Sequence, residues 1–153
     1  MANTYTQVHI QIVFAVRYRQ NLIQSGWEDE LYKYMTGIIQ NHGHKVLALN
    51  GMPDHIHILI GMRPTQGLSV LVQQVKQDSS KWINLKGYVK GRFSWQSGYG
   101  AFSYSKSQVP KIIAYIRNQK EHHKIKTFTE EYIAFLKKNE IDFKTEYIFK
   151  PVT

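Results

Sequence analysis

The chain has 153 residues, of which 42% are hydrophobic and 13% aromatic, which is enough to build a single globular domain over residues 1–153. It has no cysteine, which excludes disulfides and thiolate metal sites. No run approaches the roughly 18 apolar residues of a membrane span, and the amino terminus has no basic segment followed by an apolar one. We therefore expect a soluble protein of a reducing cytoplasm.

Lysine and arginine exceed the acidic residues by nine, and the isoelectric point is near 9.7. A charge of this sign and size is typical of proteins that bind nucleic acid, although a basic surface also serves solubility alone. The position of the basic residues along the chain is therefore more informative than their number.

The hydrophobic pattern predicts eight regular elements, because apolar residues alternate in some segments and recur every three or four residues in others. Residues 87–100 hold four glycines and four aromatic residues, and we expect a loop that becomes ordered on a partner. Thr127 or Thr129 caps the last helix. The predicted elements are a strand at 4–17, a helix at 27–43, strands at 45–50 and 55–60, a helix at 68–85, a strand at 101–105, helices at 108–124 and 129–139, and an extended tail at 143–149.

The first six elements follow the order strand, helix, strand, strand, helix, strand. Right-handed crossovers fold such a chain into an antiparallel sheet with both crossover helices on one face, which is the ferredoxin-like arrangement of the α+β class. The strands at 45–50 and 55–60 should form a hairpin with residues 51–54 as its connection. The strand at 55–60 is then central, the last helices are appended, and the second face of the sheet stays open.

Two histidines lie in the central predicted strand, in the stretch 53–58 (Pro-Asp-His-Ile-His-Ile). Because side chains alternate along a strand, His55 and His57 share one face while the isoleucines point to the core. Two imidazoles one pleat apart can bind one metal ion or a phosphate, but they are also consistent with sheet histidines that are hydrogen-bonded to neighbours. The first strand presents a polar row that could lie beside them, with His9 as a further candidate ligand; this row is Gln7, His9 and Gln11.

A second histidine pair, His42 and His44, flanks Gly43 at the predicted end of a helix. The glycine favours a helix terminus followed by a loop, so no strand fixes the relative geometry of these two histidines. We interpret them as loop residues.

The helix predicted at 108–124 carries two stripes. One valine and three isoleucines recur at helical spacing and favour packing against the sheet. A polar stripe on another side contains Tyr115 and Gln119, one turn apart. Taken alone, this polar stripe favours a solvated surface with a packed tyrosine over a functional site.

Three segments together resemble the single-tyrosine HUH transposases, the enzymes of insertion sequences that move as single-stranded DNA. They are Pro-Asp-His-Ile-His-Ile-Leu-Ile at 53–60, Trp-Gln-Ser-Gly-Tyr-Gly-Ala-Phe-Ser-Tyr-Ser at 95–105, and the helix with Tyr115 and Gln119. The resemblance spans nearly the whole chain. It implies a ferredoxin-like fold, a homodimer, recognition of DNA hairpin ends, and cleavage and rejoining of single strands through a 5′-phosphotyrosine.

Carried over to this sequence, the resemblance implies that Tyr115 is the nucleophile and that His55, His57 and Gln119 bind a divalent metal ion, either Mg²⁺ or Mn²⁺. It also implies that the tyrosine helix of one subunit can complete the active site of its partner. A phenol leaves a phosphodiester reversibly, so the tyrosine ester can store the cleaved bond until a 3′-OH reseals it.

Single-stranded DNA exposes its bases and phosphates, which suits a basic groove with aromatic side chains. Trp95 fits such a groove or the core equally well. The predicted DNA-binding residues are Arg17, Arg19, Lys90, Arg92, Phe93 and Lys111.

Two other functions fit parts of this pattern. A nucleic-acid-binding module of the same fold, such as a domesticated transposase relative, would bind without chemistry. A metal-dependent phosphoesterase would use water as the nucleophile. The joint presence of Tyr115 and Gln119 favours the transposase over both.

Overall fold

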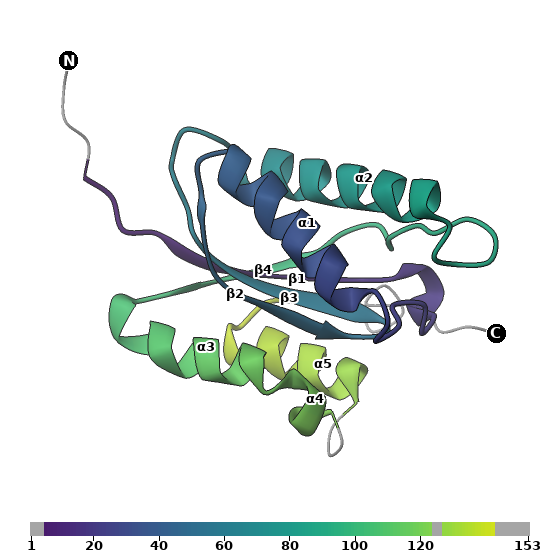
Figure 1. Ribbon diagram of the computed structural model, residues 1–153. Coiled ribbons are helices and arrows are strands. Elements are labelled where there is room, and N and C mark those ends of the chain that lie inside the picture. Colours follow the sequence, from purple (N-terminus) through teal and green to yellow (C-terminus); the bar gives the residue numbers. More distant parts are fainter. Residues whose placement is uncertain (1–4, 124–126, 143–153) are drawn as a thin grey trace.

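The computed structural model describes residues 5–123 and 127–142, and its centre is a four-stranded antiparallel sheet with the order β2-β3-β1-β4 (Figure 1). This strand order confirms the predicted ferredoxin-like α+β fold and the central position of the histidine strand. The strands are β1 (His9–Ala15), β2 (Lys45–Met52), β3 (His55–Gly61) and β4 (Gly100–Tyr104). The helices are α1 (Glu28–Asn41), α2 (Leu68–Lys86), α3 (Val109–Arg117), α4 (Gln119–His122) and α5 (Phe128–Lys138), and short 3-10 turns lie at Arg17–Arg19 and Lys106–Gln108.

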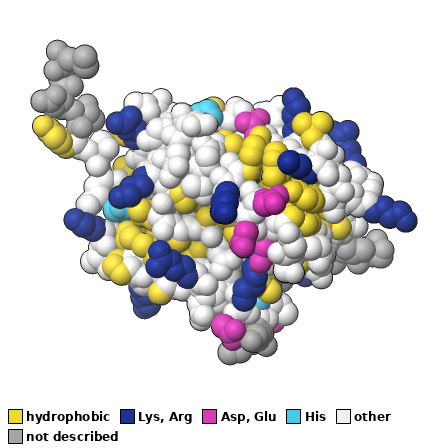
Figure 2. Space-filling model, in the orientation of Figure 1, with side chains coloured by type: hydrophobic (Ala, Val, Ile, Leu, Met, Phe, Trp, Pro, Cys, Tyr) yellow, Lys and Arg dark blue, Asp and Glu magenta, His cyan; other side chains and the backbone are white. Residues whose placement is uncertain are grey.

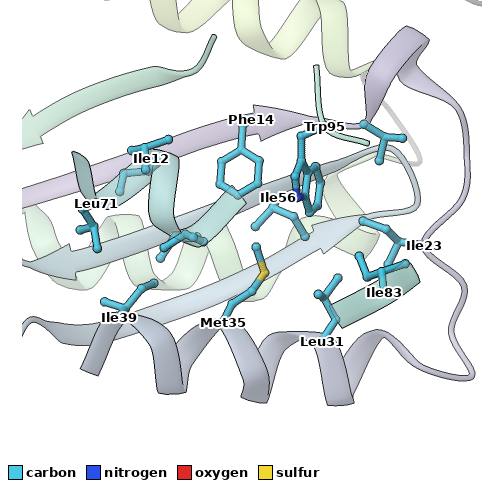
Figure 3. Packing of buried hydrophobic residues seen from close by; sticks show 14 of the residues in the cluster. Ile12, Phe14, Ile23, Leu31, Met35, Ile39, Ile56, Leu71, Ile83 and Trp95 are labelled. Atoms are coloured by element: carbon cyan, nitrogen blue, oxygen red, sulfur yellow. The ribbon is translucent and has the colours of Figure 1, made fainter. Parts of the chain in front are cut away.

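Helices α1 and α2 cover one face of the sheet and form the main hydrophobic core with it (Figure 1). Alternate residues of β1 and β3 point to this face because successive side chains of a strand point to opposite sides. Figure 3 shows Phe14 and Ile56 of the sheet directed toward Met35 of α1. The core residues on this side include Ile12, Phe14, Ile56, Ile58 and Ile60 from the sheet and Leu31, Met35, Ile39, Leu71, Val72 and Val75 from the helices.

The hairpin between β2 and β3 is confirmed, but its connection is Pro53 and Asp54 and not the predicted 51–54, because β2 continues to Met52, which pairs with His55. Gly51 is required in it because a Cβ at this position would lie 2.2 Å from the carbonyl oxygen of His55. The glycine therefore lets the two strands meet directly beside the first histidine.

The second face of the sheet is covered by α3, α4 and α5, so the prediction that it stays open was wrong (Figure 1). Apolar residues of α3 pack on β2 and β3, as the valine and isoleucine stripe predicts, and apolar residues of α5 pack on β1 and β4. The appended helices form a second layer because the sheet presents apolar side chains on this face too, among them Val13, Ala15 and Leu59.

The single helix predicted at 108–124 is divided at Asn118, where α3 ends and α4 begins. Asn50 of β2 donates from Nδ2 to two carbonyl oxygens of the last turn of α3, each at 3.1 Å. Lys120 of α4 donates to the backbone of the same strand. These contacts stabilise the helix end against the sheet and turn Gln119 inward.

The remaining differences lie at element ends. The strand predicted at 4–17 is shortened to β1, because the chain bends into a 3-10 turn at Arg17–Arg19. Thr127 caps α5, and its hydroxyl accepts from the backbone nitrogen of Glu130. The tail predicted at 143–149 lies outside the described residues. Within the described ranges, no helix is both long and apolar enough to cross a membrane.

Candidate active site

Side chains from three elements meet on the second face of the sheet. His55 and His57 project from β3 on the side opposite to its isoleucines, Tyr115 projects from α3, and Gln119 begins α4. All but Tyr115 are fully buried. The structure therefore brings together the four residues that the sequence singles out, within one chain.

His55 is neutral and has a defined tautomer. Its Nδ1 lies 2.7 Å from a carboxylate oxygen of Asp54, which can only accept, so Nδ1 carries the proton. Burial lowers the pKa of His55 to about 4, even though the hydrogen bond to Asp54 acts in the opposite direction. The Nε2 atom of His55 therefore presents a lone pair to the interior of the site.

Gln119 presents a second lone pair to the same point. Its amide nitrogen donates to Glu131 Oε2 at 3.3 Å, so its oxygen Oε1 faces His55 Nε2, also at 3.3 Å. Reversing this amide would set its oxygen against the carboxylate of Glu131, so the orientation is fixed by charge. Two acceptors that face each other across 3.3 Å are the arrangement that a cation between them would satisfy.

Glu131 of α5 is the centre of the hydrogen-bond network. Its Oε1 accepts from His57 Nε2 at 2.9 Å and from His123 Nε2 at 3.2 Å. Burial by itself raises the pKa of Glu131, but the hydrogen bonds from His123 and His57 outweigh it and hold the pKa well below the usual range. One ligand atom from each of four residues lies within 4.8 Å of the others, and these residues are His55, His57, His123 and Glu131. This buried group can hold a metal ion.

Sequence reasoning missed His123 and Glu131 as site residues. A signal for Glu131 is present, because it falls at helical spacing among Phe128, Tyr132 and Phe135, on the side of α5 that packs inward. A carboxylate on an apolar stripe needs buried partners, which marks it as part of a polar site. His123 has no comparable signal, since it follows α4 in sequence and reaches the site only through the fold.

Tyr115 contacts this network through its hydroxyl, which donates to Glu131 Oε2. Its ring centroid lies 6.0 Å from that of His57. Burial raises the pKa of Tyr115 first of all, and the negative charge of Glu131 raises it further. The phenol is therefore held protonated in this arrangement.

Helix α5 closes the site. Phe128 stacks on His55 with ring centroids 3.8 Å apart, and Phe135 contacts the rings of both His57 and Tyr115. Gly100 allows this close approach, since a Cβ there would lie 2.6 Å from the hydroxyl of Tyr132. The two histidines of β3 are shielded from solvent by α5, and a large substrate has no access to them in this arrangement.

His9, His42 and His44 lie away from this site. His9 pairs with Gly61 at the far end of β1 and is not a member of the group that can hold a metal. His44 accepts from the backbone nitrogen of Arg63 at 2.9 Å and lies 2.8 Å from Gln66 Oε1. The pair at 42 and 44 lies where α1 ends, as its interpretation as a helix end predicts, and both histidines contact the loop after β3.

The six predicted DNA-binding residues differ in exposure: four are exposed, one is half-buried and one is buried. Arg17, Lys90, Arg92 and Lys111 are exposed, and Arg19 is half-buried and donates to Thr129 of α5. The backbone nitrogen of Arg17 donates to Ser94, which brings the turn after β1 beside the loop with Lys90 and Arg92, whereas Lys111 follows β4 at the other end of the sheet. Basic side chains are spread over the face seen in Figure 2 and do not form one continuous stripe.

The prediction that Phe93 contacts DNA was wrong. Its side chain is 1% exposed and packs edge-on against Trp95 in the main core. It offers no surface to DNA in this structure. Trp95 is likewise a core residue and donates from Nε1 to Ser79 at 2.9 Å.

Comparisons with known proteins identify relatives of this chain. The sequence model of the family described as "Transposase IS200 like" matches residues 4–119. The ISDra2 transposase TnpA of Deinococcus radiodurans is 25% identical over 118 residues, which cover 74% of this chain and 84% of that protein. A crystal structure assigned as a transposase from Deinococcus radiodurans has a TM-score of 0.60 at 25% identity, covering 78% of this chain and 96% of that one.

A REP-associated tyrosine transposase, solved bound to a REP hairpin, also has a TM-score of 0.60, at 13% identity, and covers 80% of this chain and 73% of that one. This last likeness shows a shared fold. The family match spans well over half of the chain, includes the residues at 55, 57, 115 and 119, and ends before α5. The chain therefore belongs to the IS200-like transposases.

Proposed function

We propose that the protein is a metal-dependent single-strand DNA transposase, which binds hairpin ends and cleaves and rejoins DNA through a 5′-phosphotyrosine. Tyr115 is the nucleophile, and a divalent cation, Mg²⁺ or Mn²⁺, is held by His55, His57 and Gln119. The observation that carries this proposal is the convergence of a phenol with facing lone pairs of His55 and Gln119 in one buried site.

The donor set fits the proposed cation. Neutral imidazoles and an amide oxygen suit Mn²⁺ and accept Mg²⁺, and His123 and Glu131 lie close enough to add further ligands. A bound divalent cation supplies positive charge to the scissile phosphate and stabilises the departing 3′ oxygen.

In the proposed reaction, the hydroxyl oxygen of Tyr115 attacks phosphorus and the bond from phosphorus to the 3′ oxygen breaks. The phenol loses one proton and the departing 3′ oxygen gains one, so the cleaved strand ends in a 3′-OH and a 5′-phosphotyrosine. A 3′-OH from another strand then attacks the same phosphorus and releases the tyrosine. Because one ester replaces another at each step, rejoining needs no ATP.

DNA can reach this site only after α5 moves, since the helix shields the histidines. Glu131 occupies the site as an anion bound to His57, His123 and Tyr115. A phosphate carries the same sign of charge and accepts hydrogen bonds from the same donors. We propose that the scissile phosphate takes the place of Glu131 when α5 moves, and accepts hydrogen bonds from the donors that Glu131 leaves.

The proposed partner is single-stranded DNA with hairpin ends, by analogy with the relative bound to a REP hairpin. The exposed cations Arg17, Lys90, Arg92 and Lys111 are proposed phosphate contacts, and Arg19 joins them when α5 moves and releases it. Each such contact should steepen the loss of DNA affinity with salt. We also propose a homodimer, in which exchange of α3 between subunits could complete each site in trans.

A specific observation favours the alternative of a nucleic-acid-binding module without chemistry. The site is closed, and Glu131 accepts hydrogen bonds from Tyr115, Gln119 and two histidines. Such a module binds DNA whether or not metal and Tyr115 are present, so the two functions are separable by experiment.

The test is incubation with labelled single-stranded oligonucleotides from the flanks of the gene, with Mn²⁺ or with EDTA, followed by a denaturing protein gel. The proposal predicts a Mn²⁺-dependent shifted band that Tyr115→Phe abolishes while DNA binding in a native gel persists. Tyr34→Phe, on the exposed side of α1, is the matched control and should keep the band. Tight binding with no adduct on any flank would establish the binding module instead.

A further inference from the structure

Gln11 of β1 lies behind His57 and is completely buried. Its Nε2 lies 2.9 Å from His57 Nδ1, and its Oε1 accepts from the hydroxyl of Tyr104 on β4 at 2.9 Å. Because β1 pairs with both β3 and β4, the three side chains form a chain of hydrogen bonds across one face of the sheet. The polar row predicted on the first strand thus reaches the histidine strand through this one residue.

The two site histidines are held in opposite tautomers. The carboxylate of Asp54 places the proton of His55 on Nδ1 and leaves a lone pair on Nε2. The amide nitrogen of Gln11 only donates, so His57 Nδ1 carries the lone pair and His57 Nε2 carries the proton that it donates to Glu131. A cation needs a lone pair, so Nε2 of His55 is ready to bind one and Nε2 of His57 is not.

An amide can remove this obstacle because it has both a donor and an acceptor. With the amide of Gln11 reversed, its oxygen accepts from Nδ1–H of His57 and its nitrogen donates to the hydroxyl oxygen of Tyr104. A tyrosine hydroxyl donates or accepts equally well, so both hydrogen bonds of Gln11 survive the reversal. Glutamate in this position would only accept, and methionine would do neither.

We propose that Gln11 is a positioning residue whose amide reverses when a divalent cation binds, which converts His57 to the tautomer with a free lone pair on Nε2. This inference rests on the proposed function, since it requires a cation at His55, His57 and Gln119. Groups that orient the second nitrogen of a metal-bound histidine typically change metal affinity roughly 10- to 100-fold. Gln11 is therefore expected to set the affinity of the site without touching the cation.

The test measures Zn²⁺, a diamagnetic probe, binding to the wild type, Gln11→Met and Gln11→Glu by calorimetry, with the tautomer of His57 read from imidazole ¹⁵N shifts. In the wild type, the proton of His57 should move from Nε2 to Nδ1 on addition of Zn²⁺. Gln11→Met should bind Zn²⁺ roughly 10- to 100-fold more weakly. Gln11→Glu should hold the proton on Nδ1 before Zn²⁺ is added and recover the wild-type affinity or exceed it.

Gln7→Met is the matched control, because Gln7 is exposed just before the same strand, and it should leave affinity and tautomer unchanged. A merely structural role for Gln11 predicts equal weakening in the Met and Glu variants, and that result overturns the inference. So does wild-type affinity in Gln11→Met, or a His57 proton that does not move. Failure of the wild type to bind Zn²⁺ and Mn²⁺ overturns the cation site and the reversal together.

Discussion

The two faces of the sheet are built from the same strands but are held by different forces. On the side of α1 and α2, β3 contributes three isoleucines that pack against aliphatic side chains, each worth about 1.5–3 kcal/mol on full burial. On the side of α3 to α5, the same strand contributes His55 and His57, whose burial is tolerated only because each is hydrogen-bonded. The first face thus stabilises the fold. The second face holds buried polar groups, whose desolvation lowers the free energy of unfolding.

The largest expected loss in the free energy of unfolding comes from truncating a side chain of the main core. Phe14 is 1% exposed and packs edge-on against Trp95, with ring centroids 4.8 Å apart. We expect Phe14→Ala to lower the free energy of unfolding by about 3–5 kcal/mol, through lost burial and the cavity left behind. Urea denaturation measures this loss. Val8→Ala, at an exposed position before the same strand, should change it by less than about 0.5 kcal/mol. A comparable loss in both variants would contradict the assignment of stability to this face.

The first face was predictable from the sequence because its information is local. Alternation in β1 and β3 and helical spacing in α1 and α2 place the core residues without knowledge of the fold, and the ferredoxin-like order follows from the sequence of elements. Phe93 was misassigned because an aromatic residue in a glycine-rich loop looks the same in sequence whether it stacks on DNA or fills the core.

The second face was predictable only in part. His55, His57, Tyr115 and Gln119 came from spacing together with a family resemblance, and the structure brings them together. The closure by α5 was not predicted, because its contacts with the histidine strand join residues more than 70 positions apart, as in the pair His57 and Glu131. Gln11 illustrates this limit. The sequence places it in a polar row on the first strand but does not predict that it contacts His57.

Acid should weaken the second face before it affects the first. The pKa of His55 in the folded protein is about 4, below its ordinary value of 6.5, so the unfolded chain binds more protons between these values. In the metal-free protein, stability from this group is full above pH 6.5 and is lost as the pH falls toward 4, by at most about 1.4 kcal/mol per pH unit. Urea midpoints measured from pH 7.5 to 4.5 test this.

The variant His55→Phe keeps an aromatic ring against Phe128 and removes the titrating group, so its stability should vary less over the same range. The depressed pKa of Glu131 adds a separate loss, which begins only below about pH 4.5, the ordinary value for that carboxyl. Wild-type stability that stays constant from pH 7.5 to 5 would show that His55 is not held neutral by burial.

The smallest expected effect concerns the movement of α5. Thr127 caps this helix, so Thr127→Ala should destabilise it locally by about 1 kcal/mol and raise the population of the open site roughly fivefold. Hydrogen exchange of α5 amides should accelerate by that factor while amides of α1 stay unchanged, because α1 packs on the opposite face. Thr36→Ala, which removes a hydroxyl from α1, is the control and should leave α5 unaffected. Faster exchange across both faces would mean that α5 opens only by global unfolding, and the proposed replacement of Glu131 by a phosphate would then lack a route.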